Sequence, residues 1–212
     1  MAQMNLLQQL IYYYQQNGVY VLSQFSRHFL ISIYGVLFAA IVGIPIGIFI
    51  AHHSRLSATV IAIANVIQTI PSLAMLSIIM IGLGLGVNTV IVTVFLYALL
   101  PIIKNTYTGM QNVSASILDS GKGMGMTRWQ LLRMVELPLS LSVIMAGLRN
   151  ALVLAIGITA IGTFVGAGGL GDIIATNGGA IILAGALPTA LMAIIADTVL
   201  AWIEKRADPT QK

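Results

Sequence analysis

The sequence predicts an all-α integral membrane protein with about five transmembrane helices and a polar loop on the cytoplasmic side. Hydrophobic residues make up 58% of the 212 residues, and charged residues only 8%. Soluble domains carry about 25% charged residues, so this composition is typical of a chain that lies in a bilayer. The apolar residues also form long stretches, each close to the length of about 20 residues that a spanning helix needs.

These apolar stretches take up most of the chain. They cover approximately residues 29–51, 58–83, 87–103, 139–165 and 180–203. The third is the shortest, and we expect Pro101 and Lys104 to mark its end. No linker is long enough for a second domain, so residues 25–204 are interpreted as one transmembrane domain, followed by a cytoplasmic tail at 205–212.

The first 24 residues mix leucine, isoleucine and tyrosine with glutamine, which makes this segment (residues 1–24) too polar to span a bilayer. We expect it to lie at the membrane interface, with Tyr12, Tyr13 and Tyr14 at the depth of the lipid headgroups. The segment has neither a basic start nor a clean apolar run, so the sequence predicts no cleavable signal peptide.

The loop between the third and fourth stretches is the longest run that looks unlike membrane. Residues 119–122 can end one short helix, and Gly125 tolerates a sharp turn. Thr127 and Gln130 have the spacing of a capping box, which begins a second helix, and Pro138 suits the first turn of a further one. The pattern predicts a helical hairpin that stands outside the bilayer and fits a groove in a partner.

Several residues of this loop stand at spacings found in a known family. The run begins with an acidic residue and two small ones, and a glycine stands six residues after the acid. It ends with an apolar residue, then one residue of any type, then leucine and proline. These residues are Asp119, Ser120, Gly121, Gly125, Val135, Leu137 and Pro138. On them the loop, 108–138, resembles the cytoplasmic loop of permease subunits of binding-protein-dependent ABC importers, with Asp-Ser-Gly in place of the family's Glu-Ala-Ala. The resemblance implies that they couple transport to an ATPase; the alternative is an ordinary basic loop between membrane helices.

The resemblance implies a type I ABC importer fold, like that of methionine permeases, and an assembly of several chains. Two permease subunits, which are identical or sister chains, share the lipid bilayer and contact two ATPase subunits that bind ATP and magnesium. A separate extracellular substrate-binding protein delivers the solute. This chain is then a transport subunit without a cofactor of its own, and it is not an enzyme.

Two strings indicate the branch of the family. Residues 68–76, QTIPSLAML, resemble osmoprotectant permeases, and residues 165–172, VGAGGLGD, resemble the same region of methionine and osmoprotectant importers. The resemblance implies import of glycine betaine, carnitine, choline or a related quaternary amine. A methionine or other amino-acid permease is the alternative. A secondary transporter is a further one, although it calls for inverted repeats that the sequence does not display.

The lysines and arginines assign the two sides of the membrane. They gather after the first stretch, after the third stretch and in the tail, as Arg55, Lys104, Lys122, Arg128, Arg133, Lys205, Arg206 and Lys212. The links after the second and fourth stretches carry none. An odd number of spans then places the N-terminus outside and the C-terminus in the cytoplasm. We expect a multi-pass protein of the bacterial cytoplasmic membrane.

Four polar residues interrupt the second stretch at the spacing of one helical face. They are Asn65, Gln68, Thr69 and Ser72, and Pro71 lies among them. Polar groups are costly in hydrocarbon, so this stripe is expected to face other helices or a water-filled path. It either lines the translocation pathway or forms hydrogen bonds between helices, and the resemblance of residues 68–76 favours the pathway.

Two charged residues, Arg149 and Asp197, lie inside the fourth and fifth stretches at similar depths. An isolated charge at such a depth costs at least about 2.5 kcal/mol. We therefore expect the two side chains to pair, within one subunit or across a dimer. The alternative is that Arg149 extends to the interface while Asp197 reaches cytoplasmic water.

The sequence indicates no catalytic or metal-binding residues. No nucleophile stands near a base, no Walker-type phosphate loop occurs, and cysteine is absent. The string GAGGLG at 166–171 matches a dinucleotide-binding pattern in letters, but a membrane helix precedes it in place of a strand. His52 and His53 flank a basic loop, which favours headgroup contacts over metal ligation. Basic clusters on a soluble face are missing outside the central loop, which argues against nucleic acid as a partner.

Overall fold

The computed structural model describes residues 5–176 and 178–207, and every regular element in this part of the chain is helical. The elements are α1 Leu6–Ala51, α2 Ser54–Thr69, α3 Ser72–Leu83, α4 Val87–Gln111, α5 Ala115–Gly123, α6 Arg128–Leu131, the π-helical turn η1 Leu132–Glu136, α7 Leu137–Ile161, the 3-10 turn η2 Gly162–Val165, α8 Leu170–Ile174 and α9 Gly179–Ala207. Four helical segments are long and apolar enough to cross a membrane, and α2 with α3 makes a fifth if this bent pair is one span. The predicted all-α membrane fold is confirmed.

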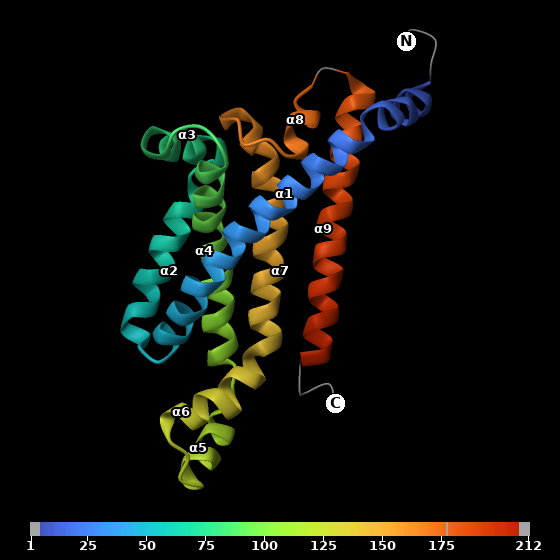
Figure 1. Ribbon diagram of the computed structural model, residues 1–212. Coiled ribbons are helices and arrows are strands. Elements are labelled where there is room, and N and C mark those ends of the chain that lie inside the picture. The colour runs from blue at the N-terminus through green and yellow to red at the C-terminus, as the bar shows by residue number, and fades with distance from the viewer. Residues whose placement is uncertain (1–4, 177, 208–212) are drawn as a thin grey trace.

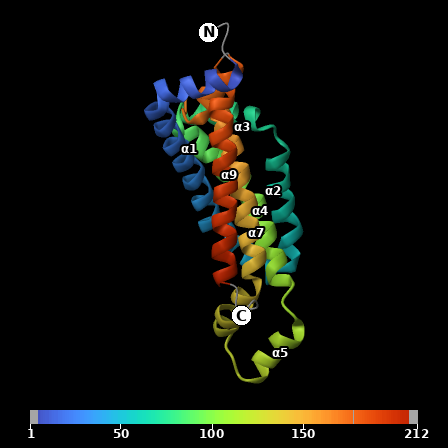
Figure 2. The ribbon, with the colours of Figure 1, turned by 90° about the vertical axis from the view of Figure 1, so that its right-hand side faces the viewer.

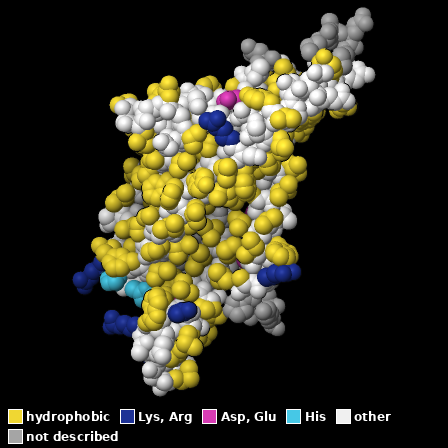
Figure 3. Space-filling model, viewed as in Figure 1, with side chains coloured by type: hydrophobic (Ala, Val, Ile, Leu, Met, Phe, Trp, Pro, Cys, Tyr) yellow, Lys and Arg dark blue, Asp and Glu magenta, His cyan; other side chains and the backbone are white. Residues whose placement is uncertain are grey.

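The spanning helices form one bundle with two distinct ends (Figures 1 and 2). The α5–α6 hairpin and the C-terminal ends of α1, α4 and α9 lie toward one end, which we call the hairpin end. The helices α3 and α8 lie at the opposite end. An apolar surface covers the middle of the molecule, and lysine and arginine side chains stand mainly toward the hairpin end (Figure 3).

Helices α1 and α4 run parallel and approach closely through glycines. A Cβ atom added to Gly35 of α1 would lie 2.3 Å from Cγ1 of Val94, and one added to Gly47 would lie 2.6 Å from Cβ of Thr106. The residue numbers rise along both helices from the first contact to the second, so α1 and α4 point in the same direction. Small residues let helix backbones approach in lipid, where burial of apolar surface does not drive association.

Helix α7 runs antiparallel to α4 and occupies the centre of the bundle, where it also packs against α1 and α9. Glycines again make the contact close. A Cβ atom at Gly147 would lie 2.8 Å from the carbonyl oxygen of Pro101, and one at Gly109 would lie 3.1 Å from that of Ser140. The α4–α7 pair thus continues directly into the two arms of the hairpin.

Helix α1 is longer than a bilayer requires. Its 46 residues extend about 69 Å at 1.5 Å per residue, and it crosses the bundle obliquely (Figure 1). Non-helical backbone angles at Asn17 bend this helix. The helix continues through residue 24, where the sequence analysis places the end of the N-terminal segment. The interfacial position of residues 1–24 stays a prediction, and Met1 to Met4 fall outside the described residues, as do residues 208–212 of the tail.

Two expected spans differ from the observed helices. The stretch 58–83 is not one straight helix, because α2 and α3 meet at an angle of 96°. A proline disfavours helical angles in the residue before it, and Ile70, which precedes Pro71, is extended at φ −69° and ψ 128°. The expected end of the third span at Pro101 and Lys104 is also wrong. Helix α4 continues through both residues to Gln111.

Candidate functional site

The hairpin formed by α5 and α6 protrudes beyond the bundle (Figures 1 and 2). Its turn is made by Gly125, whose φ of +79° favours glycine. Thr127 begins α6 with a complete capping box. The Gln130 backbone N–H donates to Thr127 Oγ1 at 3.3 Å, and the Thr127 N–H donates to Gln130 Oε1 at 2.8 Å. The predicted helix, glycine turn and helix are confirmed, and Pro138 lies in the first turn of α7 as expected.

The other motif residues hold the hairpin together or lie on its surface. A Cβ atom at Gly121 would lie 2.7 Å from Cδ1 of the buried Leu131, so α5 and α6 pack closely at this glycine. Ser120 Oγ donates to the carbonyl of Ser116 at 2.8 Å.

Asp119 accepts from Lys122 Nζ at 3.0 Å, but both side chains are well exposed, and such surface pairs contribute little to stability. Val135, Leu137 and Pro138 are half-buried at the base.

The hairpin presents large apolar side chains to its surroundings. Met124 is 77% exposed, Trp129 66% and Met134 65%. Helix α6 buries the side chain of Leu131 and leaves that of Trp129 exposed. Exposed apolar groups of this size, on a part of the chain that protrudes from the bundle, are typical of protein-binding surfaces.

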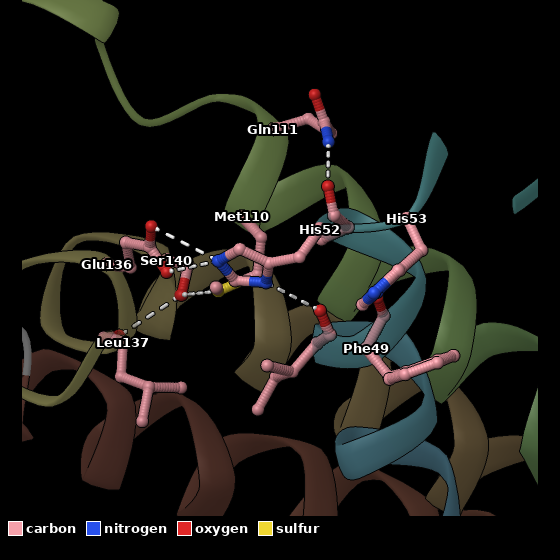
Figure 4. A network of polar contacts seen from close by, with 10 residues as sticks. Phe49, His52, His53, Met110, Gln111, Glu136, Leu137 and Ser140 are labelled. Atoms are coloured by element: carbon pink, nitrogen blue, oxygen red, sulfur yellow. Dashed lines mark hydrogen bonds and ion pairs between the residues drawn. The ribbon is translucent and has the colours of Figure 1, made fainter. Parts of the chain in front are cut away.

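The base of the hairpin is tied to the ends of α1 and α4 by polar contacts (Figure 4). The buried carboxylate of Glu136 lies 3.1 Å through Oε2, and 3.4 Å through Oε1, from Nε2 of His52. Gln111 Nε2 of α4 donates to the carbonyl of Ala51 of α1 at 2.8 Å, and Ser140 Oγ of α7 lies 3.5 Å from Met110 Sδ of α4. The His52–Glu136 contact thus links the base of the hairpin to the end of α1, and the other two contacts join α4 to α1 and α7 beside it. The predicted headgroup contact of His52 stays untested, and the sequence does not indicate its contact with Glu136.

An open cavity of about 950 Å³ lies where α2 bends into α3, between these helices and α4 and α7. Its lining includes Gln68, Thr69, Ile70, Pro71, Ser72, Tyr97, Leu100, Pro101, Lys104, Asn105, Thr108, Asn150, Leu154 and Ile158. Three of the four predicted pathway residues are therefore on its wall. The fourth, Asn65, is exposed and lies outside the lining, and Ser72 belongs to α3, so the expected single stripe is wrong.

Tyr97 of α4 holds the α2–α3 bend in place. Its hydroxyl donates to the carbonyl of Ile70, at the residue where α2 ends. Gln68 Nε2 donates back to the carbonyl of Tyr97 at 3.4 Å. Since Ile70 and Gln68 flank the bend on the cavity wall, α4 fixes the shape of the cavity at that point.

Arg149 and Asp197 meet between α7 and α9 of the same chain. Arg149 Nε donates to Asp197 Oδ1 at 2.8 Å, and Arg149 Nη2 donates to Asp197 Oδ2 at 2.9 Å. The two side chains thus form a bidentate ion pair. The other terminal nitrogen lies 3.2 Å from Glu204 Oε2. Glu204 stands seven residues, or two helical turns, after Asp197, and this spacing is the signal in the sequence that points to a third member of the cluster.

The glycine-rich loop at 166–171 packs against α1 at the end opposite the hairpin. Gly166, Gly168 and Gly169 all have positive φ. The Gly169 N–H donates to Gln24 Oε1 at 2.6 Å, and a Cβ atom at Gly168 would lie 2.9 Å from Arg27 Nε. The loop is therefore shaped by packing against a helix, and neither a strand nor a βαβ unit accompanies it in the described chain.

Comparisons with known proteins identify the family. Residues 43–209 match the model of the binding-protein-dependent transport system inner membrane component. The chain is 68% identical to the Bacillus subtilis glycine betaine/carnitine/choline transport system permease protein OpuCD, over 99% of this chain and 93% of that one. It is 64% identical to the Listeria monocytogenes carnitine transport permease protein OpuCD, over 98% of this chain and 96% of that one.

Solved structures agree on the fold. An inward-facing crystal form of the MetNI methionine ABC transporter gives a TM-score of 0.77 at 21% identity, over 88% of this chain and 95% of that one. The predicted likeness to methionine permeases is thus confirmed for the fold. The chain belongs to the family of binding-protein-dependent transport system inner membrane components, the permease subunits of ABC importers.

Proposed function

We propose that this chain is the permease subunit of an ABC importer for small osmoprotectants of the glycine betaine, carnitine and choline type. The observation that carries the proposal is the 68% identity, over 99% of the chain, to a permease named for these three solutes. The likeness to the methionine transporter, at 21% identity, concerns the fold alone. It therefore does not favour methionine as the solute.

In the proposed assembly, two ATPase subunits grip the hairpins of two permease subunits, which are copies of this chain or sister chains. The exposed Met124 and Trp129 supply apolar contact area for such a grip. ATP and magnesium bind to the ATPase subunits. Closure of the ATPase pair then moves the hairpin, and the contact of Glu136 with His52 passes that motion to α1.

The proposed orientation places the hairpin end in the cytoplasm. Basic residues gather there, on the hairpin and near the ends of α1 and α9, in accord with the excess of lysine and arginine that cytoplasmic loops carry. The N-terminus is then outside. An extracellular binding protein docks at the end formed by α3, α8 and the glycine-rich loop and releases the solute toward the cavity lined by Gln68, Thr69 and Ser72.

Uptake measurements test this proposal. Cells that lack their own importers would express the chain with its ATPase, any sister permease and the binding protein, and be given labelled glycine betaine, carnitine, choline and methionine. We expect ATP-dependent uptake of at least one quaternary amine and none of methionine. Uptake of methionine alone would overturn the proposed solute, and uptake that persists without the ATPase would overturn the proposed mechanism.

A matched pair of glycine variants tests the role of the hairpin in the same cells. Gly125→Ala forces an alanine into a left-handed conformation, which costs about 1 kcal/mol or more and distorts the turn. Gly123→Ala adds a methyl group into open space at an ordinary φ. We expect the first variant to lose uptake and co-purification of the ATPase while the second retains both. Equal behaviour of the two variants would contradict the coupling role.

A further inference from the structure

Lys104 stands out among the residues that line the cavity. It lies inside α4, its side chain is exposed, and it forms no hydrogen bond or ion pair with any residue that the structure describes. No other lining residue carries a charge. A cation within the apolar part of a membrane protein is costly unless it meets water or a partner, so its position calls for a function.

The described acidic side chains are all engaged elsewhere. Asp119 pairs with Lys122, Glu136 with His52, Asp172 with the Thr163 hydroxyl, and Asp197 and Glu204 with Arg149. The cavity wall therefore presents one positive charge and no negative charge. A solute in this cavity meets a charged partner for a carboxylate and no charged partner for a cation.

Neutral hydrogen-bonding side chains line the cavity together with Lys104. Thr108 lies one helical turn further along α4, which places its hydroxyl on the same face. Asn150 reaches the cavity from α7, which packs close to α4 through Gly147. Neither Thr108 nor Asn150 has a side-chain hydrogen bond to another described residue. Hydroxyl and amide donors beside an ammonium group form a set that suits a carboxylate.

The rest of the cavity suits the other end of such a solute. Leu100, Leu154 and Ile158 give it an apolar wall, and Tyr97 presents the one aromatic ring of the lining, about 10 Å from Lys104 along α4. An aromatic face attracts a quaternary ammonium without holding it as firmly as a carboxylate would. The wall thus offers weak contacts for the ammonium end and a charged contact for the carboxylate end.

We propose that Lys104 binds the carboxylate of a zwitterionic solute during translocation and so makes the permease itself favour carboxylate-bearing quaternary amines over choline. This inference rests on the proposed function, because it concerns which of those solutes passes the permease. Glycine betaine and carnitine carry both a quaternary ammonium and a carboxylate, whereas choline carries only the cation. Lys104 attracts the first two and repels the third.

The test uses the whole importer in proteoliposomes, with one binding protein throughout and each solute supplied at saturating concentration for that protein. Transport of glycine betaine, carnitine and choline is measured for the wild type, Lys104→Gln and Lys104→Arg. Lys205→Gln, an exposed lysine near the end of α9 outside the cavity, is the matched control. ATPase activity and the thermal unfolding midpoint of each variant are recorded alongside.

We expect Lys104→Gln to lower the maximal rate for glycine betaine and carnitine about tenfold relative to that for choline, the scale of one lost charge-assisted hydrogen bond. Lys104→Arg and Lys205→Gln keep the wild-type ratio. Equal loss for all three solutes, the result expected if Lys104 only contacts lipid phosphate, would overturn the inference, as would no change. If the wild-type importer moved none of the three, the proposed function itself would fail.

Discussion

The imidazole of His52 lies 3.1 Å from the buried carboxylate of Glu136, although 84 residues separate them in the chain. Glu136 ends the π-helical turn η1 between the hairpin and α7, and His52 directly follows α1. The second ring nitrogen of His52 lies 3.0 Å from the carbonyl of Ile48. Both ring nitrogens of His52 thus face oxygen atoms. Single turns of π-helix are frequent at functional sites, and this one carries the residue that joins the hairpin to α1.

Replacing His52 with alanine should weaken the structure at this joint. It leaves the Glu136 carboxylate, only 6% exposed, without its partner, and an unsatisfied buried group costs about 1–3 kcal/mol. We expect a lower thermal unfolding midpoint for His52→Ala in detergent and a lower ratio of solute moved to ATP hydrolysed. His53→Ala is the control, because the His53 side chain is exposed and contacts Phe49 of α1 instead of Glu136. Equal effects of the two variants would exclude a special role for the pair.

The sequence predicted the spanning helices α4, α7 and α9 and the hairpin because their signals are local. Apolar length identifies a span, and the hairpin combines a capping box, a glycine and a loss of hydropathy within some twenty residues. The bend at Ile70 was missed although Pro71 is a local signal for it. Apolar composition does not report the direction of the backbone, so the stretch that contains Pro71 read as one span.

Among the site residues, those with a local signal in the sequence were predicted, and those that depend on contacts between distant residues were not. Gln68, Thr69 and Ser72 were predicted as pathway residues because polar groups in an apolar helix are conspicuous, and all three line the cavity. Their role in transport stays a prediction. Contacts that depend on packing between helices gave no signal in the sequence, because nothing near His52 points to Glu136. The sequence also predicts that Lys104 lies at the end of a span, whereas α4 continues past it to Gln111.

The parallel contact of α1 with α4 predicts a strong effect of one methyl group. Gly35→Ala places a Cβ atom 2.3 Å from Cγ1 of Val94, and such overpacking costs about 1–3 kcal/mol. We expect a lower thermal unfolding midpoint of the purified importer, partly recovered when Val94→Ala removes the clashing methyl. Gly18→Ala lies on the same helix with no atom within 4 Å and should be neutral or slightly stabilising. An unchanged unfolding midpoint for Gly35→Ala would mean that α1 and α4 lie further apart at Gly35 than the 2.3 Å contact implies.

The cluster of Arg149, Asp197 and Glu204 predicts an order of effects that a single ion pair would not give. Arg149→Gln leaves two carboxylates close together with no cation, whereas Asp197→Asn leaves Arg149 with Glu204, and Glu204→Gln leaves the bidentate ion pair intact. We therefore expect stability to fall most for Arg149→Gln, less for Asp197→Asn and least for Glu204→Gln. Because the side chains are partly exposed, the largest loss should be about 1–3 kcal/mol.

Exchange of the two charges separates pairing from simple removal of a polar group. Arg149→Asp combined with Asp197→Arg restores opposite charges across α7 and α9 and again places the arginine near Glu204, two turns away on its own helix. We expect the double variant to regain part of the unfolding midpoint that each single exchange loses, which is the behaviour of directly interacting residues. Additive losses in the double variant would show that Arg149 and Asp197 do not stabilise each other, and that each meets water or lipid headgroups on its own.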